Sequence, residues 1–467
     1  MDRQDSVSNR PWHIELQGID PIPDSERHGQ IQDLFWIWFA GNLGLLGVVY
    51  GAMLFSFGLN FWQSLLAIIV GSLSFLLVGS FSVAGRDGGV PMMTLSRSVF
   101  GIYGNVLPNL VSWISLVGWE TITVIIGTLA LMVLFGDGGR VQSDISAGIS
   151  LLIMVGASIV AGLLGQATLV IIQKWASYVF GILTLAVTGL LLSHTDWAHV
   201  FHHPEGPWIT GFVPAVSIII AGTGLSWTNT AADYSRYLPR SASARRIVAT
   251  STLGAFIPLV FLMGVGMLAA TTEPQLPTAL NPLTVLGREM PSWMTVPYFL
   301  TAAGGLVVEA DLSLYSSGLN LLNLFVPFAR YQTVMLDAVI MVTGTIYIVF
   351  IAKNFLVSFE AFVVLLGVGL AAWAGIFLAY QLVVYVHRLP LYRDDADLHL
   401  IEWPATFIWI ISVGVGLLFT SSPWFSGPFA QGIFAHSNLE ILMTFVISLL
   451  GYGLWSWKSS FTRDTDG

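Results

Sequence analysis

The acidic residues Glu120, Glu309 and Asp311 lie inside long apolar stretches of this sequence. Glu120 lies in the stretch LVGWETITVIIG, while Glu309 and Asp311 lie in the stretch LVVEADLSLYSSGLN. A carboxyl group at membrane depth is costly, and where one is retained it commonly marks a path for a substrate or a proton. We therefore regard all three as candidate ion-coupling residues. The alternative is a structural role, in which each carboxyl group is hydrogen-bonded inside a helix bundle.

Helical geometry separates the two acids of the second stretch. Residues three and four apart share one face of a helix. One face of this stretch carries Glu309, Ser313, Ser316 and Asn320. The opposite face carries Asp311, Tyr315 and Gly318. The two carboxyl groups thus lie on different faces, and we do not expect them to share a proton.

Two tryptophans could bind a planar ligand by stacking. Trp119 shares a helical stripe with Ser115 and Thr123, and Glu120 lies about 100° away from that stripe. Trp227 lies in the stretch AGTGLSWTNTAADYSRYLPR. An indole ring offers a flat π face, so the pair suits an aromatic or amide-bearing ring. Packing inside the protein is the alternative role for both tryptophans.

A charged cluster follows Trp227 at the end of the same stretch. It consists of Asp233, Arg236 and Arg240. We expect these side chains to form a local ion-pair cluster at the membrane surface that also orients the helix. A salt bridge that opens and closes a gate is the alternative.

The composition identifies the class of protein that must position these residues. Of the 467 residues, 55% are hydrophobic and 10% are charged, whereas a soluble domain carries about 25% charged residues. The chain has no cysteine, which excludes disulfides, thiol catalysis and zinc–thiolate sites. No nucleophile–base motif supports an enzyme, no basic stripe supports nucleic-acid binding, and the histidines between residues 194 and 203 lack the spacing of a metal site. We expect no cofactor and no bound metal.

Long apolar runs predict a multi-pass, all-α membrane protein, because a hydrocarbon core of about 30 Å needs roughly 20 apolar residues per helix. The sequence has twelve such runs: 33–58, 61–84, 104–135, 146–166, 170–193, 210–231, 247–271, 293–326, 332–351, 355–386, 403–422 and 437–457. With the N-terminus inside, fifteen Lys or Arg residues lie on the inner side and three, Arg140, Arg288 and Lys353, on the outer side. The positive-inside rule therefore predicts that both termini are in the cytoplasm.

Two of the predicted helices are interrupted at matching depth. The first carries Gly41, Asn42, Gly44 and Gly47 in the middle of its run, and the sixth carries Gly222, Thr223 and Gly224. Paired interruptions in two halves of a chain are the best sequence pointer to the binding site of a transporter. Unwound backbone is tolerated at membrane depth only where it is buried or lines a cavity. Close helix packing at the glycines is the alternative.

Several motifs together resemble the nucleobase–cation symporter family, most closely its purine/cytosine permease branch. They are GRDGGVPMMTLSRSVFGIYGN, LVGWE, SWTNTAADYSRYLPR and the Tyr-Ser-Ser-Gly-Leu that begins at Tyr315. The resemblance extends from the first to about the tenth helix. It implies a leucine-transporter-like fold of twelve helices: two inverted five-helix repeats (33–193 and 210–386) and two C-terminal helices (403–457), with cytoplasmic tails at residues 1–32 and 458–467.

The resemblance also implies a substrate site midway across the membrane. In such permeases the base stacks on the tryptophan of the third helix, here Trp119, and a polar residue one turn on, here Thr123, helps to bind it. The broken helices would contribute Ala40, Gly41, Asn42, Thr223, Gly224 and Trp227.

Two departures from the family pattern concern the substrate and the ion. Many relatives carry Asn or Gln where this chain has Thr123, and an Asn-rich stretch where it has Glu309 and Ser313. A carboxylate there would suit a base with amidine-like N–H donors. Sodium-coupled relatives use hydroxyl groups of the eighth helix, but this chain has Ala-Ala-Gly-Gly at residues 302–305. A proton is therefore favoured over sodium, with Glu309 as its carrier.

The sequence thus predicts a secondary transporter of the cytoplasmic membrane that imports a nucleobase-like heterocycle, such as cytosine or a purine, with a proton or another cation. Its partners would be this small molecule and the lipid bilayer. Two alternatives stay open. One is an amino-acid–cation symporter on the same fold, whose broken helices would bind a carboxylate. The other is a sensor that binds its substrate without accumulating it.

Overall fold

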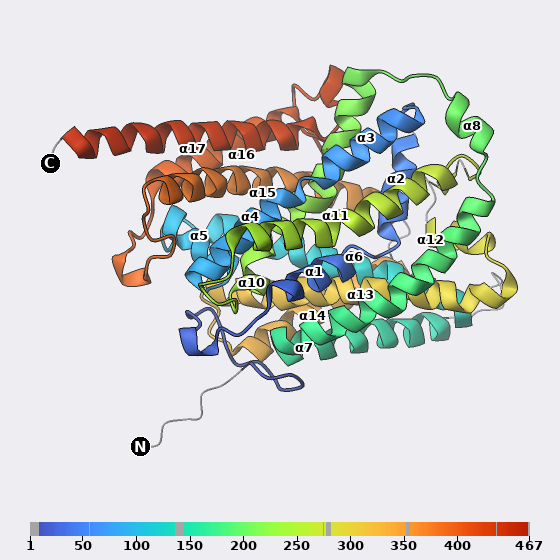
Figure 1. Cartoon of the computed structure of the whole chain (residues 1–467), viewed down its shortest axis with the longest axis horizontal. Coiled ribbons are helices and arrows are strands. Elements are labelled where there is room, and N and C mark those ends of the chain that lie inside the picture. The colour runs from blue at the N-terminus through green and yellow to red at the C-terminus, as the bar shows by residue number, and fades with distance from the viewer. Residues whose placement is uncertain are drawn as a thin grey trace.

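The computed structural model describes residues 9–465, except 56, 136–143, 274, 277–281, 352–354 and 436. Most of these residues are helical (Figure 1). The α-helices are α1 (Ile31–Ala40), α2 (Leu46–Phe55), α3 (Phe61–Ser72), α4 (Phe75–Gly88), α5 (Met92–Phe100), α6 (Val106–Phe135), α7 (Asp144–Ser193), α8 (Trp197–His202), α9 (Val213–Ile220), α10 (Ala231–Ser235), α11 (Ala244–Ala269), α12 (Pro282–Arg288), α13 (Ser292–Asn323), α14 (Arg330–Ile346), α15 (Phe355–Val386), α16 (Trp403–Phe419) and α17 (Leu439–Thr465). The strands β1 (Ser421–Ser422) and β2 (Phe425–Ser426) form a short antiparallel ribbon.

The helices have the length and composition of membrane spans. Within the described residues, eight helices are long and apolar enough to cross a bilayer, among them α6, α11 and the joined α3 and α4. Two shorter apolar helices, 145–160 and 403–419, accompany them. The prediction of a multi-pass helical architecture is therefore confirmed. The connection between the second and third predicted spans contains the helix α5.

Both predicted interruptions are present. α1 ends at Ala40 and α2 begins at Leu46, so the backbone between them is not α-helical. In the sixth predicted span, a π-helical turn (Ala221–Leu225) and a 3₁₀ turn (Thr228–Thr230) separate α9 from α10. Glycine costs more conformational entropy to fix in a helix than any other residue, which favours irregular backbone at these positions.

A third interruption divides α7 between two predicted spans. Gly165 has φ 78° and ψ −176°, which lies outside the helical region. A side chain at this position would be strained, because positive φ disfavours residues with a Cβ atom. A Cβ would also overlap the side chain of Glu15. The two halves of α7 correspond to the predicted runs 146–166 and 170–193.

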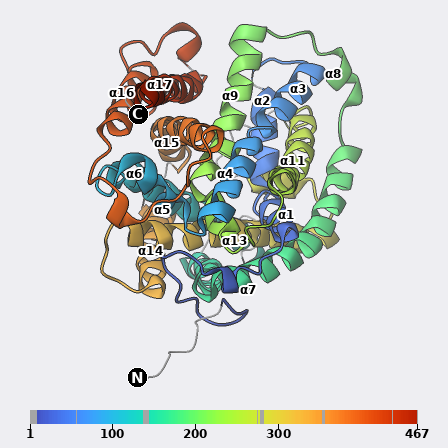
Figure 2. The ribbon, with the colours of Figure 1, turned by 60° about the vertical axis from the view of Figure 1, so that its left-hand side comes forward.

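Most helices belong to two groups whose members pack closely among themselves. The first helix group comprises α1, α2, α4, α10 and α11, and the second comprises α6, α13, α14 and the first half of α7. In Figure 2, α7, α13 and α14 lie below α4 and α11. Glycines bring helix backbones together within the first group, since a Cβ at Gly266 would overlap the carbonyl oxygen of Val48. α15, α16 and α17 pack together beside the second group, which they contact through α6.

Residues 9–30, which we name the N-terminal strap, pack against one end of the helix bundle. The strap, the helix α5 and the end of α17 lie towards the left in Figure 1. Backbone hydrogen bonds attach the strap to the body, from the Ile22 N–H to the Gly89 carbonyl at 2.9 Å and from the Gly29 N–H to the Tyr237 carbonyl at 3.0 Å. Glu15 and Arg27 are buried in this contact. The polar tail expected from the sequence is thus folded onto the protein over these residues.

Candidate functional site

A small pocket lies between the second helix group and the interrupted segment that joins α9 to α10. Its lining residues are Leu116, Trp119, Gly222, Ser226, Trp227, Glu309 and Ser313. The structure therefore brings together four of the predicted substrate-binding residues, from α6, α13 and the α9–α10 segment. Their role in binding a substrate stays a prediction.

The carboxylate of Glu309 lies between the pocket and the first broken helix. A Cβ at Gly44, in the break between α1 and α2, would lie 3.3 Å from Glu309 Oε2. In the described part of the chain, no side chain or backbone N–H donates a hydrogen bond to this carboxylate. An ionised carboxylate with little access to water needs donors to offset its lost hydration. The group is thus suited to accept a proton or to bind N–H groups of a ligand.

Two buried tryptophans form walls of the pocket. Trp119 and Trp227 are 9% and 7% exposed. The Trp227 ring packs edge-on against Trp38, with the ring centroids 5.7 Å apart and the planes at 73°. A Cβ at Gly222 would lie 2.6 Å from the Tyr50 hydroxyl oxygen, so glycine makes room for this hydroxyl beside the pocket. The pocket therefore combines aromatic faces with hydroxyl and carboxylate groups.

Three other predicted substrate-binding side chains are engaged within their own helices. The hydroxyl of Thr123 donates to the carbonyl groups of Trp119 and Glu120 at 3.1 and 2.9 Å. Thr223 donates to the Ile219 carbonyl at 2.6 Å. The Asn42 amide donates to the Trp38 carbonyl at 2.8 Å. None of the three lines the pocket in this conformation.

The remaining candidates serve close packing. A Cβ at Gly41 would lie 2.5 Å from a methyl carbon of Leu312, and one at Gly224 would overlap Ser74. Ala40 is buried at the end of α1. The break in the first helix therefore approaches the pocket through Gly44, whereas Ala40, Gly41 and Asn42 do not line it.

The two other candidate ion-coupling acids lie away from this pocket. Glu120 Oε2 accepts a hydrogen bond from Ser317 at 3.4 Å and lies near a further buried acid, Asp337. Asp337 accepts a hydrogen bond from the indole N–H of Trp113 at 2.9 Å. Both carboxylate oxygens of Asp311 are buried without a hydrogen-bond partner in the described residues. Asp337 was not a sequence candidate, although an ionisable residue in the predicted run 332–351 is the signal that could have identified it.

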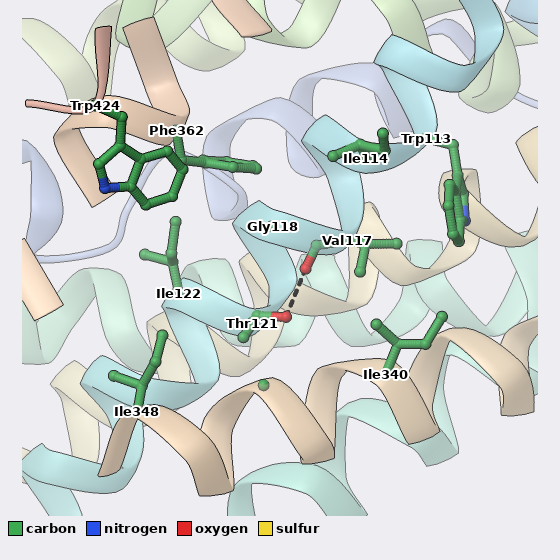
Figure 3. Close-up of a pocket in the computed structure, with 11 residues that line it drawn as sticks. Trp113, Ile114, Val117, Gly118, Thr121, Ile122, Ile340, Ile348, Phe362 and Trp424 are labelled. Carbon is green, nitrogen blue, oxygen red and sulfur yellow. Dashed lines mark hydrogen bonds between the residues drawn. The ribbon is translucent and has the colours of Figure 1, made fainter. Parts of the chain in front are cut away.

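A larger pocket is less suited to a polar ligand. It has a volume of about 380 Å³ and lies between α6, α14 and α15, as Figure 3 shows. Its walls are mostly apolar, with the rings of Phe362 and Trp424 on one side and Ile340 on the other. The hydroxyl of Thr121 already donates to the Val117 carbonyl at 2.6 Å. Among the described residues, no charged side chain lines this pocket, so it offers few groups that could hydrogen-bond to the polar edge of a heterocycle.

Asp233 in α10 and the two arginines that follow this helix, Arg236 and Arg240, do not form the expected local cluster. Within the described residues, the Asp233 carboxylate accepts a hydrogen bond from the Met92 N–H at 2.8 Å. Arg236 instead forms an ion pair with Glu15 at 2.8 Å, and Arg240 pairs with Asp24 at 2.9 Å. The two arginines bind the N-terminal strap, which sequence periodicity could not indicate because their partners lie more than 200 positions away.

Comparisons with known proteins agree with this architecture. The family model for permeases for cytosine/purines, uracil, thiamine and allantoin matches residues 21–439. The putative purine-cytosine permease YxlA of Bacillus subtilis is 27% identical, over 90% of this chain and 91% of that protein. The purine-cytosine permease FCY2 of Saccharomyces cerevisiae is 28% identical over 57% of this chain and 50% of its own length.

A solved structure shares the fold. Mhp1, a nucleobase-cation-symport-1 family transporter in a closed conformation with bromovinylhydantoin bound, superposes with a TM-score of 0.73 over 95% of this chain and 96% of that one, at 18% identity. Since the family model covers most of the sequence, the chain belongs to the family of permeases for cytosine/purines, uracil, thiamine and allantoin.

Proposed function

We propose that this permease imports a nucleobase-like heterocycle together with a proton. The observation that carries the proposal is the pocket in which Trp119, Trp227 and Glu309 meet between helices of both halves of the chain. An aromatic face binds a planar ring by stacking, which contributes about 1–3 kcal/mol for a nucleobase. A carboxylate in the same pocket adds recognition of the polar edge.

The proposed membrane arrangement follows the sequence and the family. Twelve spans would cross the cytoplasmic membrane, with both termini in the cytoplasm and the ten first spans arranged as two inverted repeats. The broken first and sixth spans support it, since such breaks occupy corresponding positions in the two repeats of transporters. Rocking of the first helix group against the second would give alternating access to the pocket.

The substrate class follows from the chemistry of Glu309. A protonated carboxyl group donates one hydrogen bond through its O–H and accepts one at its carbonyl oxygen, and the ring nitrogen and amino group of cytosine or adenine offer the matching acceptor and donor. The hydroxyl of Ser313, one turn along α13, could add a further hydrogen bond. Among family substrates, we therefore favour rings with an amidine-like edge, such as cytosine or adenine.

The coupling ion is proposed to be a proton. Residues 302–305 of α13 have no hydroxyl side chain for a sodium ion, whereas Glu309 can take up a proton in the pocket. Asp311 and Glu120 are further proton-binding candidates in the same pair of helices. No cofactor takes part in this proposal, and transport rather than catalysis is the proposed activity.

Purified protein in sealed proteoliposomes tests this function. We expect labelled cytosine or adenine to accumulate when the outside is made more acidic than the inside, and to equilibrate without accumulation when the two pH values are equal. A sodium gradient at equal pH serves as the matched control and should drive no accumulation. Accumulation under the sodium gradient alone would contradict proton coupling.

A further inference from the structure

The N-terminal strap carries one buried carboxylate with an unusually full set of partners. Glu15 is 4% exposed. Its Oε1 atom accepts hydrogen bonds from Arg236 at 2.8 Å, from the Tyr237 hydroxyl at 2.7 Å and from the Tyr315 hydroxyl at 3.3 Å. Its Oε2 atom accepts from the Gln166 N–H at 2.8 Å and lies 3.9 Å from Arg330.

These partners belong to both helix groups. Arg236 and Tyr237 directly follow α10 of the first group, whereas Tyr315 lies on α13 and Arg330 begins α14 of the second group. Gln166 lies at the break in α7. The strap backbone takes part as well, since Arg236 donates to the Gly18 carbonyl at 2.6 Å and Arg330 to the Glu15 carbonyl at 3.4 Å. The N-terminal strap therefore joins the two helix groups at the end of the bundle against which it packs.

The joined end lies next to the candidate substrate pocket. α13 runs from Ser292 to Asn323, so Tyr315 and Ser316 lie nearer the strap than Glu309 and Ser313 do. Tyr234 packs against this part of α13, with its hydroxyl 2.8 Å from the Leu312 carbonyl and 3.0 Å from Ser316 Oγ. The pocket itself has a volume of about 10 Å³, and a single water needs about 10–15 Å³. The pocket is therefore too small to hold a substrate in this conformation.

Charge keeps this closure intact over the physiological pH range. Burial alone would raise the pKa of Glu15, but Arg330, Arg236 and the Tyr237 hydroxyl outweigh burial and hold the pKa below its ordinary value. A carboxyl group whose pKa is lower in the folded protein than in the unfolded chain stabilises the folded protein at pH values above its unfolded-state pKa. This stabilisation is lost only as the pH falls through the folded-state pKa. A proton that arrives at neutral pH therefore does not break the contacts of Glu15. Movement of the helices has to break them instead.

We propose that Glu15 is an ionic bridge that holds the cytoplasmic exit of the transporter closed, and that the strap must separate from the second helix group before substrate is released. This inference rests on the proposed transport function and on the cytoplasmic location of the strap. Glu15 acts here as a positioning residue, because it contacts the two helix groups and not the pocket.

Cysteine labelling measures the closure directly, since the chain has no cysteine of its own. A Ser226→Cys reporter places one thiol in the pocket. In inside-out vesicles, Glu15→Gln should raise the rate at which a membrane-impermeant maleimide labels this thiol by about tenfold or more, because losing one partner of a buried ion pair strongly destabilises the state that buries it. The matched control is Asp24→Asn, which removes the exposed strap pair with Arg240 and should change the rate less than about twofold.

A cross-link provides a second test that does not depend on the folding of the Glu15→Gln variant. A Cβ at Gly18 would lie 3.4 Å from a methyl carbon of Leu322 on α13. The pair Gly18→Cys and Leu322→Cys would therefore tie the strap to the second helix group when oxidised. We expect oxidation to stop substrate exchange and a reducing agent to restore it, while either single variant should be insensitive to both treatments.

The outcomes separate this proposal from the proposed function. Faster labelling in Glu15→Gln together with redox-controlled exchange supports the bridge. Unchanged labelling in a folded Glu15→Gln protein overturns it, and so does normal exchange by the oxidised pair. The labelling needs no substrate, so it reports on the bridge even if no heterocycle proves to be transported.

Discussion

Replacing Trp119 with alanine is expected to abolish uptake while leaving the amount of protein in the membrane about unchanged. The indole of Trp119 is a wall of the pocket, beside Glu309 and opposite the α9–α10 segment. Loss of one stacking face weakens base binding by about 1–3 kcal/mol, which is roughly a fivefold to 150-fold weaker affinity. Since alanine also leaves the pocket misshapen, transport at low substrate concentration should fall by at least that factor.

Two control variants make this result specific. Trp119→Phe keeps a flat ring and should retain a measurable part of the uptake. Trp62→Ala removes a tryptophan that is 67% exposed on α3 and should transport normally. Uptake is measured with labelled substrate, and the amount of protein by immunoblotting of the membranes. Normal uptake by Trp119→Ala would remove this residue from the site.

Replacing Glu309 with glutamine is expected to separate substrate exchange from proton-driven accumulation. Glutamine keeps the size of the side chain and one carbonyl oxygen but cannot carry a proton. Accumulation driven by an acid-outside pH gradient should therefore be lost, while exchange of labelled for unlabelled substrate across vesicles at equal pH continues. The residual exchange should no longer depend on pH. Both assays use the same proteoliposome preparation.

Glu440 supplies the matched control for this experiment. Its carboxylate is also buried, near the start of α17, and both of its oxygens have no hydrogen-bond partner in the described residues. Because it does not line the pocket, Glu440→Gln should leave accumulation intact. Normal pH-driven accumulation by Glu309→Gln would rule out Glu309 as the proton carrier. Loss of exchange as well as accumulation would assign Glu309 to substrate binding instead.

Local features of the sequence were enough to locate the helix breaks and part of the pocket. The glycines at residues 41, 44 and 224 interrupt apolar runs, and the structure has its irregular backbone at these points. Trp119 and Glu309 stood out because a large aromatic and an acid are unusual inside apolar runs, and both line the pocket. The multi-pass helical class followed from the length of the apolar runs, and the two faces of α13 followed from helical periodicity.

The details that depend on distant contacts could not be read from the sequence. Thr123 shares a helical stripe with Trp119, yet its hydroxyl is satisfied by the helix backbone and does not reach the pocket. Gly41 and Gly224 interrupt helices as expected, but their lack of a side chain serves packing against Leu312 and Ser74. Glu15 lies in a polar segment, where nothing in the local pattern distinguishes it from a solvated residue.

Ligand binding by the purified protein tests the central claim most directly. A panel of cytosine, adenine, uracil, hydantoin, allantoin, the pyrimidine half of thiamine and several amino acids would be added to the protein in detergent, with and without sodium, and its melting temperature measured. A ligand that binds only the folded state stabilises it by about 2.7 kcal/mol at a hundredfold excess over Kd. We predict a rise in melting temperature for a heterocycle with an amidine-like edge, independent of sodium and absent in Trp119→Ala. A rise for amino acids alone would contradict the assignment of this pocket to a nucleobase-like ring.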